Sequence, residues 1–148
     1  MLNALALTAR GFYSVFWQAS VLCFSSAAEG LLVSDEEWSG ITKRRAKAFA
    51  CITKTSKEER DEAYEHFSKL YAIRSDIVHG RIIPSGNKDK NVEIWIEWSE
   101  LLRSLWRTVL SDERLLKTLD EPDSARKELF LDIERDFKPS KASTARPS

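Results

Sequence analysis

Apolar residues recur at helical spacing along most of the chain, and polar or turn-forming segments divide the pattern into five stretches. These stretches lie at about 4–33, 36–53, 56–79, 92–109 and 122–137. Their lengths suit the helices of a globular domain, and the short connections between them suit antiparallel neighbours. The pattern therefore predicts an all-α fold, an antiparallel bundle of about four to five helices.

Residues with strong preferences for helix ends mark several of these boundaries. Ser34-Asp35 is an N-cap pair before the second stretch, and Ser56 with Glu59 has the spacing of a capping box before the third. Gly80 suits a left-handed C-terminal stop directly after His79. We expect a loop over 81–90, which contains Pro and Gly, and a last helix that opens at Pro122.

Two segments allow a second interpretation. Apolar and polar residues alternate over Val92–Trp98 as in a strand, but apolar residues continue at helical spacing to Val109. A lone strand would have no partner, so we favour a helix and leave an extended start open. Residues 12–28 carry no charge and could form a secretory signal core. A polar stripe favours an amphipathic helix instead: Ser14, Gln18, Ser25 and Glu29. The segment is also short for a membrane span, so we expect no membrane partner and a cytoplasmic location.

Composition sets limits on the domain organisation and on the chemistry. A chain of 148 residues, 43% of them hydrophobic, predicts one domain over 1–137, and 138–148 has the composition of a disordered tail. Because 23 Lys and Arg balance 23 Asp and Glu, no overall field attracts nucleic acid. Cys23 and Cys51 form no Cys/His cluster, so we expect no metal site and no cofactor.

Arg74 is the residue that fits a plain helical bundle least well. It falls within the apolar stripe of the third stretch, where a guanidinium is costly to bury unless it is paired and hydrogen-bonded. A simpler interpretation packs the aliphatic part of its side chain on the stripe and leaves the guanidinium in water. If the first and third stretches pack together, Glu29 could instead hold Arg74 in place.

A second stripe on the same stretch consists of small residues and ends in a histidine: Ser68, Ala72, Ser75 and His79. Small side chains allow another helix, or a second copy of this one, to approach closely, although the stripe could also be an exposed polar face. Arg74 and His79 are five residues apart, about 140° around an ideal helix, and so do not share one narrow face. For the two to act together, the helix must end at His79 or a second subunit must contribute.

The string Leu70–Gly80, LYAIRSDIVHG, resembles the signature of HEPN domains and is closest to the Apea-like group, in which Arg-Ser-x-x-x-His-Gly follows a tyrosine. Upstream, Ala27–Leu32 resembles the opening helical pattern of the family, with Glu29 in the acidic position. The similarity covers roughly 12–116. It implies a helical bundle that dimerises through the motif-bearing helices. In active members, the paired Arg and His residues form a metal-independent endoribonuclease site.

Carried onto this chain, the resemblance makes Arg74 and His79 the candidate catalytic residues. His79 would act as proton acceptor or donor, and Arg74 would stabilise the charged phosphorane. The supporting candidates are Glu29, which would hold Arg74, and Ser75 and Asp76, which would orient the histidine or contact phosphate. Weaker candidates for gripping the RNA backbone are the loop residues Arg81, Lys88 and Lys90 and the cluster Lys43, Arg44 and Arg45, for which a solvated helix face is the simpler interpretation.

These features leave two main functions open. The first is a ribonuclease, for example a toxin or an antiviral-defence effector, that works as a homodimer and has RNA, an antitoxin or a larger defence complex as partners. The second is a HEPN module without catalysis that binds RNA or protein and dimerises. A plain helical interaction domain with a chance motif is a third.

Overall fold

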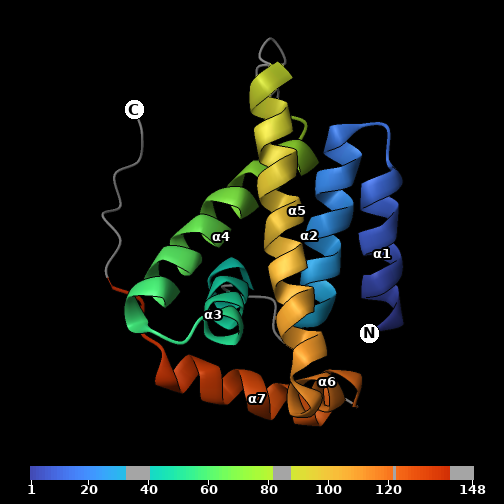
Figure 1. The fold of residues 1–148 in the computed structure, drawn as a ribbon. Helices are drawn as coiled ribbons and strands as arrows, with labels where there is room; N and C mark the ends of the chain where they lie inside the picture. Colours follow the sequence, from blue (N-terminus) through green and yellow to red (C-terminus); the bar gives the residue numbers. More distant parts are fainter. Residues whose placement is uncertain (33–40, 82–87, 122, 141–148) are drawn as a thin grey trace.

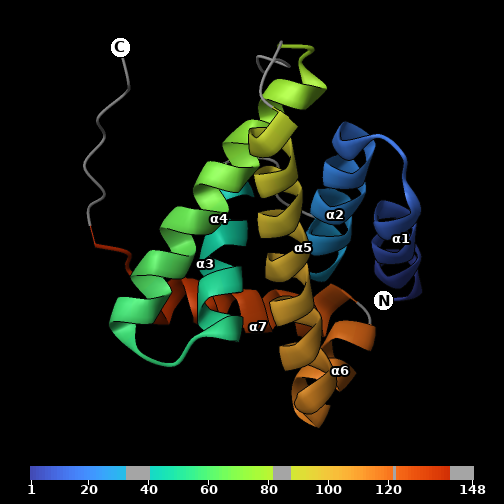
Figure 2. The same ribbon diagram turned by 45° about the horizontal axis from the view of Figure 1, so that its top comes forward.

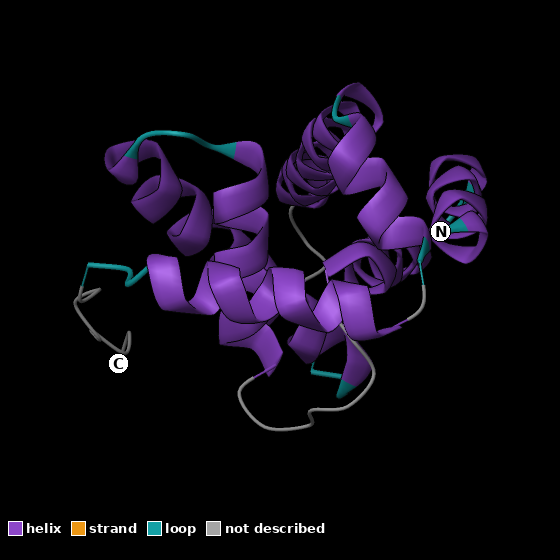
Figure 3. Ribbon diagram, turned by 90° about the horizontal axis from the view of Figure 1, so that it is seen from below, coloured by secondary structure: helices purple, strands orange, loops and turns teal. Residues whose placement is uncertain are grey.

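The computed structural model of the chain describes residues 1–32, 41–81, 88–121 and 123–140. Within these ranges it contains helices and no strand, so the all-α prediction is confirmed there (Figure 3). The described helices outnumber the predicted four to five: α1 Leu2–Tyr13, α2 Trp17–Leu32, α3 Ile41–Thr53, α4 Lys57–Val78, α5 Lys88–Ser111, α6 Glu113–Asp120 and α7 Asp123–Asp136.

The helices form a bundle whose long members α2, α4 and α5 surround a common core (Figure 1). Helices α1 and α2 run antiparallel beside α5, whereas α4 inclines away from them and covers α3. Helix α7 crosses the base of the bundle below α3, and α6 lies at the foot of α5 (Figure 2). This arrangement places the C-terminal end of α4 and the start of α5 at the same end of the molecule.

Aromatic side chains fill the centre of the core. The ring of Phe67 on α4 is stacked on Tyr71 with centroids 6.0 Å apart and meets Trp98 of α5 edge-on at 6.1 Å. Phe49 of α3 approaches the same ring to 5.3 Å. Such ring pairs stabilise the core in addition to the stabilisation that comes from burying apolar area. Phe67 therefore joins α3, α4 and α5 at one point, and this packing fixes which face of α4 is turned inward.

The first predicted helix, 4–33, is in fact two, which corrects the sequence interpretation. Ser14 ends α1 in an extended conformation (φ −73°, ψ 134°), and α2 begins at Trp17. The expected polar stripe from Ser14 to Glu29 is thereby interrupted, and Ser25 is buried. The chain turns back because α1 has apolar residues to bury against α2. Gly11 allows the close approach, since a Cβ at that position would lie 2.4 Å from the Phe24 ring.

The end signals of α4 are confirmed. The Ser56 Oγ accepts from the backbone N–H of Glu59 at 3.2 Å, and the Glu59 carboxylate accepts from the backbone N–H of Ser56, which is a capping box. At the other end Gly80 has φ +63°. Its N–H donates to the Ile77 carbonyl at 3.1 Å, and the N–H of Arg81 donates to the Asp76 carbonyl at 2.9 Å. This is the Schellman arrangement, so α4 ends at His79 for a local reason.

Other boundaries differ from the prediction or lie outside the described residues. Helix α5 already begins at Lys88, so the expected loop 81–90 is shorter, and 92–98 is helical without an extended start. Helix α6 was not predicted, although the Asp112 carboxylate caps it by accepting from the N–H groups of Arg114 and Leu115. The N-cap pair Ser34-Asp35 and Pro122 lie outside the described residues.

The chain after α7 returns to the start of α4. The backbone N–H and the hydroxyl of Ser140 bond to the Asp61 carboxylate at 2.9 and 2.6 Å. These bonds lower the pKa of Asp61. Ser140, the third residue of the expected tail, thus contacts α4, and 141–148 lie outside the described residues.

Candidate functional site

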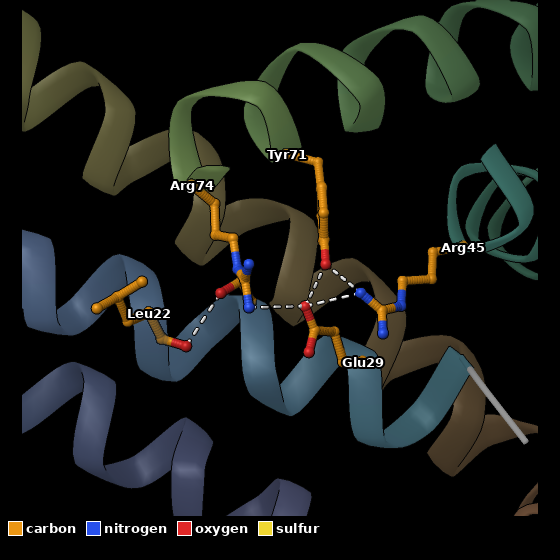
Figure 4. Close-up of polar contacts among 6 residues, drawn as sticks. Leu22, Glu29, Arg45, Tyr71 and Arg74 are labelled. Carbon is orange, nitrogen blue, oxygen red and sulfur yellow. Dashed lines mark hydrogen bonds and ion pairs between the residues drawn. The ribbon is translucent and has the colours of Figure 1, made fainter. Parts of the chain in front are cut away.

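Arg74 and Tyr71 lie one turn apart on α4, on the side that faces α2 and α3 (Figure 4). The inward direction follows from the core, because Phe67 and Leu70 of the same helix are fully buried. Glu29 comes from α2 and Arg45 from α3, and both point toward the same spot. We call these four residues, Glu29, Arg45, Tyr71 and Arg74, the Glu29 cluster.

A single carboxylate oxygen holds the Glu29 cluster together. Glu29 Oε1 forms ion pairs with Arg45 Nη1 at 2.8 Å and with Arg74 Nη2 at 3.3 Å. The Tyr71 hydroxyl donates to the same oxygen and accepts from Arg45 Nη1 (Figure 4). The guanidinium carbons of Arg45 and Arg74 lie 5.4 and 5.3 Å from the centre of the Tyr71 ring, within cation–π range.

The cluster carries more positive than negative charge. Its two guanidinium groups face one carboxylate, and Tyr71 is neutral because burial and its hydrogen bond to Glu29 raise its pKa to about 12. The side chains of Arg45, Glu29 and Arg74 are only 12, 20 and 24% exposed. Among the described residues, the buried Nε atoms of both arginines have no hydrogen-bond partner. The cluster is therefore an incompletely neutralised cationic group near the surface, able to attract an anion.

His79 lies at the C-cap of α4, five residues beyond Arg74, and its side chain is exposed. Its backbone N–H donates to the Ser75 carbonyl at 3.0 Å. The imidazole forms no hydrogen bond or ion pair with the part of the chain that the structure describes, so a substrate or a second subunit can approach it.

The structure joins some predicted site residues and separates others. Glu29 contacts Arg74, as expected if the first and third stretches pack together. Arg74 points toward Glu29, whereas His79 is exposed at the helix end, and no hydrogen bond or ion pair joins the two side chains within the described residues. Asp76 forms an ion pair with Arg81 at 2.8 Å and is occupied by that partner rather than by His79. Ser75 is half-buried.

The weaker candidates also take separate places. Arg45 was expected on a solvated helix face or on RNA, but its guanidinium lies in the Glu29 cluster, which corrects that expectation. Lys43 and Lys90 are exposed, and Arg44 is half-buried. Arg81 is exposed beside the end of α4. The Lys88 side chain is outside the described residues.

Sequence reasoning missed the roles of Tyr71 and Arg45. The sequence interpretation used Tyr71 only as the tyrosine of the motif, but its ring is buried in the core and its hydroxyl reaches the Glu29 carboxylate. The signal available was its spacing of three from Arg74, which puts both side chains on one helical face. Arg45 had no such signal, since it stands in a run of basic residues and its partner is far away in sequence.

Among the described residues, no group of three or more His, Cys, Asp or Glu side chains is placed to hold a metal ion. None of the described helices is both long and apolar enough to cross a bilayer.

Comparison of the chain with protein-family models, with curated proteins and with solved structures finds no match. The resemblance to HEPN domains therefore stays a prediction from the motif residues, and the function proposed below is based on the geometry of α4 and its neighbours.

Proposed function

We propose that the chain is a HEPN-type endoribonuclease that cuts RNA through attack of a 2′-hydroxyl on the adjacent phosphate. The observation that carries the proposal is on α4. Arg74 is held by Glu29 within a cluster of excess positive charge, and the exposed His79 follows five residues later at the end of the same helix. A permanent cation and an imidazole that can accept or donate a proton are the two components that this reaction needs.

The reaction forms a bond between the 2′-oxygen and phosphorus and breaks the bond between phosphorus and the 5′-oxygen. One imidazole accepts the proton of the 2′-hydroxyl, and a second, protonated imidazole donates a proton to the departing 5′-oxygen. The products are a 2′,3′-cyclic phosphate and a free 5′-hydroxyl. Arg74 stabilises the negative charge that develops on the phosphorane oxygens. Because the attacking group is the 2′-hydroxyl, DNA is not a substrate.

The two imidazoles come from two subunits in this proposal. Each chain supplies one His79, and the small side chains of Ser68, Ala72 and Ser75 lie on the stripe of α4 that leads to it. Contact between two α4 helices along this stripe would bring the two motifs together. The homodimer is therefore part of the proposed site. An antitoxin and a larger defence complex remain predictions from the resemblance, and a cytoplasmic location remains a prediction from the character of residues 12–28.

A second candidate is a HEPN module that binds RNA or protein without cutting it. One observation favours it: Arg74 is already paired with Glu29. In this case the cationic cluster binds phosphate, and no proton transfer follows. The two candidates differ in whether bound RNA is cleaved.

The test is incubation of the purified chain with end-labelled single-stranded and structured RNA in the presence of EDTA. We expect products that carry a cyclic phosphate, and no cleavage of strands with 2′-deoxy residues throughout. The variants His79→Ala and Arg74→Ala should lose cleavage by a factor of about 100 or more.

Two substitutions outside the motif serve as matched controls. His66→Ala removes an exposed histidine that pairs with Glu97 at 3.1 Å, and Arg135→Ala removes an exposed arginine that pairs with Asp132 at 3.2 Å. Both should keep wild-type cleavage. Equal residual cleavage in all four variants would indicate a contaminating nuclease and contradict the proposal. Binding without cleavage by the wild type would support the second candidate.

A further inference from the structure

Helix α1 is apolar on both of its sides, and the described part of the chain covers only one of them. Its inner side packs against the bundle through Ala4, Gly11 and Phe12, and Thr8 accepts a hydrogen bond from Trp106 at 2.8 Å. The opposite side carries five exposed residues, whose spacing in the sequence places them on one face of the helix: Leu2, Leu5, Ala6, Ala9 and Tyr13. We call these five residues the outer face of α1. A helix that is hydrophobic all round is normally buried all round.

The exposure on this helix and in the turn after it is large. Leu2 and Tyr13 are 80 and 88% exposed, and Val15 and Phe16 are 91 and 72% exposed. Burial of side chains of this size removes on the order of several hundred Å² of apolar surface per subunit, which approaches the roughly 800 Å² per partner of a stable interface. Exposed patches of this extent mark contact sites in soluble proteins.

The order of side chains along α1 fits a second copy of the same helix. The two alanines, Ala6 and Ala9, lie at the middle of the outer face, with large side chains toward both ends. When two such helices pack antiparallel about a two-fold axis, alanine meets alanine at the crossing, so the axes approach closely. Leu2 and Leu5 of one copy then meet Tyr13 of the other, and large residues fill the space at both ends.

The charges of the chain favour a second copy of the chain over a lipid surface as the partner of the outer face of α1. The formal net charge is zero, so two copies do not repel each other. Helices that bind membrane surfaces carry several Lys or Arg residues on a free polar side. Helix α1 has only Arg10 as a charged side chain, and the side opposite its outer face is packed on the bundle.

From these observations we infer that the outer face of α1 is an isologous dimer interface, in which α1 of one chain packs antiparallel on α1 of a second copy. This contact is separate from the contact through α4 in the proposed ribonuclease and does not depend on it.

The test measures the mass of the full chain by light scattering and sedimentation over a range of micromolar concentrations. We expect a dimer of twice 17.0 kDa, or a multiple of that dimer if the α4 contact also forms. Ala9→Glu places a charge at the centre of the outer face and should weaken the α1 association at least tenfold, with an unchanged circular dichroism spectrum. The matched control is Ala72→Glu, the same change at an exposed alanine on α4, which should leave the α1 association intact.

Crosslinking tests the antiparallel arrangement directly. In a background with Cys23→Ala and Cys51→Ala, a mixture of Ala6→Cys and Ala9→Cys chains should oxidise to the mixed disulfide faster than either chain alone forms its own. A wild-type monomer, or a dimer that Ala72→Glu dissociates and Ala9→Glu does not, would overturn the inference. So would a monomer that co-sediments with phosphatidylglycerol vesicles and loses that binding with Ala9→Glu. Loss of RNA cleavage in Ala72→Glu alone would concern the proposed function and not this interface.

Discussion

Tyr71 combines a core position with a polar contact. Its ring is buried against Phe67, and its hydroxyl bonds to the Glu29 carboxylate, so the phenol is held in its neutral form. Burial is the larger cause of its raised pKa, and the hydrogen bond to Glu29 adds to it. The same hydroxyl accepts from Arg45, so one small group contacts side chains from two other helices.

The raised pKa of Tyr71 predicts a loss of stability at high pH. The folded-state pKa is about 12 against an ordinary value of 10.0, so the neutral phenol stabilises the fold fully below pH 10. This contribution disappears as pH rises through 12, because the unfolded chain releases the proton first. The free energy of unfolding should fall by about 2 to 3 kcal/mol across that window.

Urea unfolding at a series of pH values measures this dependence. Tyr71→Phe should flatten the curve between pH 10 and 12, while Tyr13→Phe, which alters an exposed ring, should leave it unchanged. The free energy of unfolding of Tyr71→Phe will still depend on pH to some extent, since burial also raises the pKa of Tyr64. Identical curves for wild type and Tyr71→Phe would contradict the assignment.

At the scale of the elements, α1 and α2 form one antiparallel pair because their contact surface accommodates a large ring. Phe24 of α2 lies directly over Gly11 of α1, where no Cβ fits without displacement. No proline or glycine marks the turn between the two helices at Ser14 and Val15. The break is therefore made by the packing of α1 on α2, with no local signal of its own.

Two glycine substitutions test that account. Gly11→Ala should destabilise the fold by about 1 to 3 kcal/mol, because its Cβ would overlap the Phe24 ring. Gly30→Ala is the matched change on α2, where the nearest atom, Ala4 Cβ, would lie at an ordinary 3.6 Å. It should be neutral or stabilise by up to about 1 kcal/mol through helix propensity. Thermal unfolding of both variants gives the comparison, and equal effects would refute the close-packing explanation.

For the whole molecule, the Glu29 cluster connects three helices through one carboxylate. Glu29 on α2 contacts Arg45 on α3 and Arg74 on α4, so the same residue that holds a candidate catalytic group also joins the bundle. Site geometry and global stability are coupled through it.

Replacement of the carboxylate should reveal this coupling. Glu29→Gln leaves two guanidinium groups without a counter-charge in a partly buried place, and we expect a loss of about 1 to 3 kcal/mol. Glu97→Gln, which alters an exposed pair with His66, should cost less than about 0.5 kcal/mol. Urea unfolding provides both values. A Glu29→Gln variant as stable as Glu97→Gln would show that the cluster contributes little to folding.

Much of the fold was predictable because its signals are local. The capping box at Ser56, the glycine after His79 and the helical spacing of 101–109 each act within a few residues, and the structure has all three. The end of α3 at Thr53 was likewise predicted. Helix α6 was missed although its cap at Asp112 is local, since the sequence interpretation continued from Val109 to Pro122 without assigning it.

The sequence by itself determined the helical class, the ends of α4 and the candidate pair Arg74 and His79, since periodicity, capping and motif spacing are properties of neighbouring residues. Only the tertiary structure decided that Tyr71 and Arg45 join Glu29 and Arg74 in one cluster. Tyr71 lies 42 residues from Glu29 and 26 from Arg45, and contacts at such separations depend on how whole helices pack. The division of the first stretch into α1 and α2, and with it the exposed outer face of α1, has the same cause: burial of one apolar side outweighed the continuity of a helix.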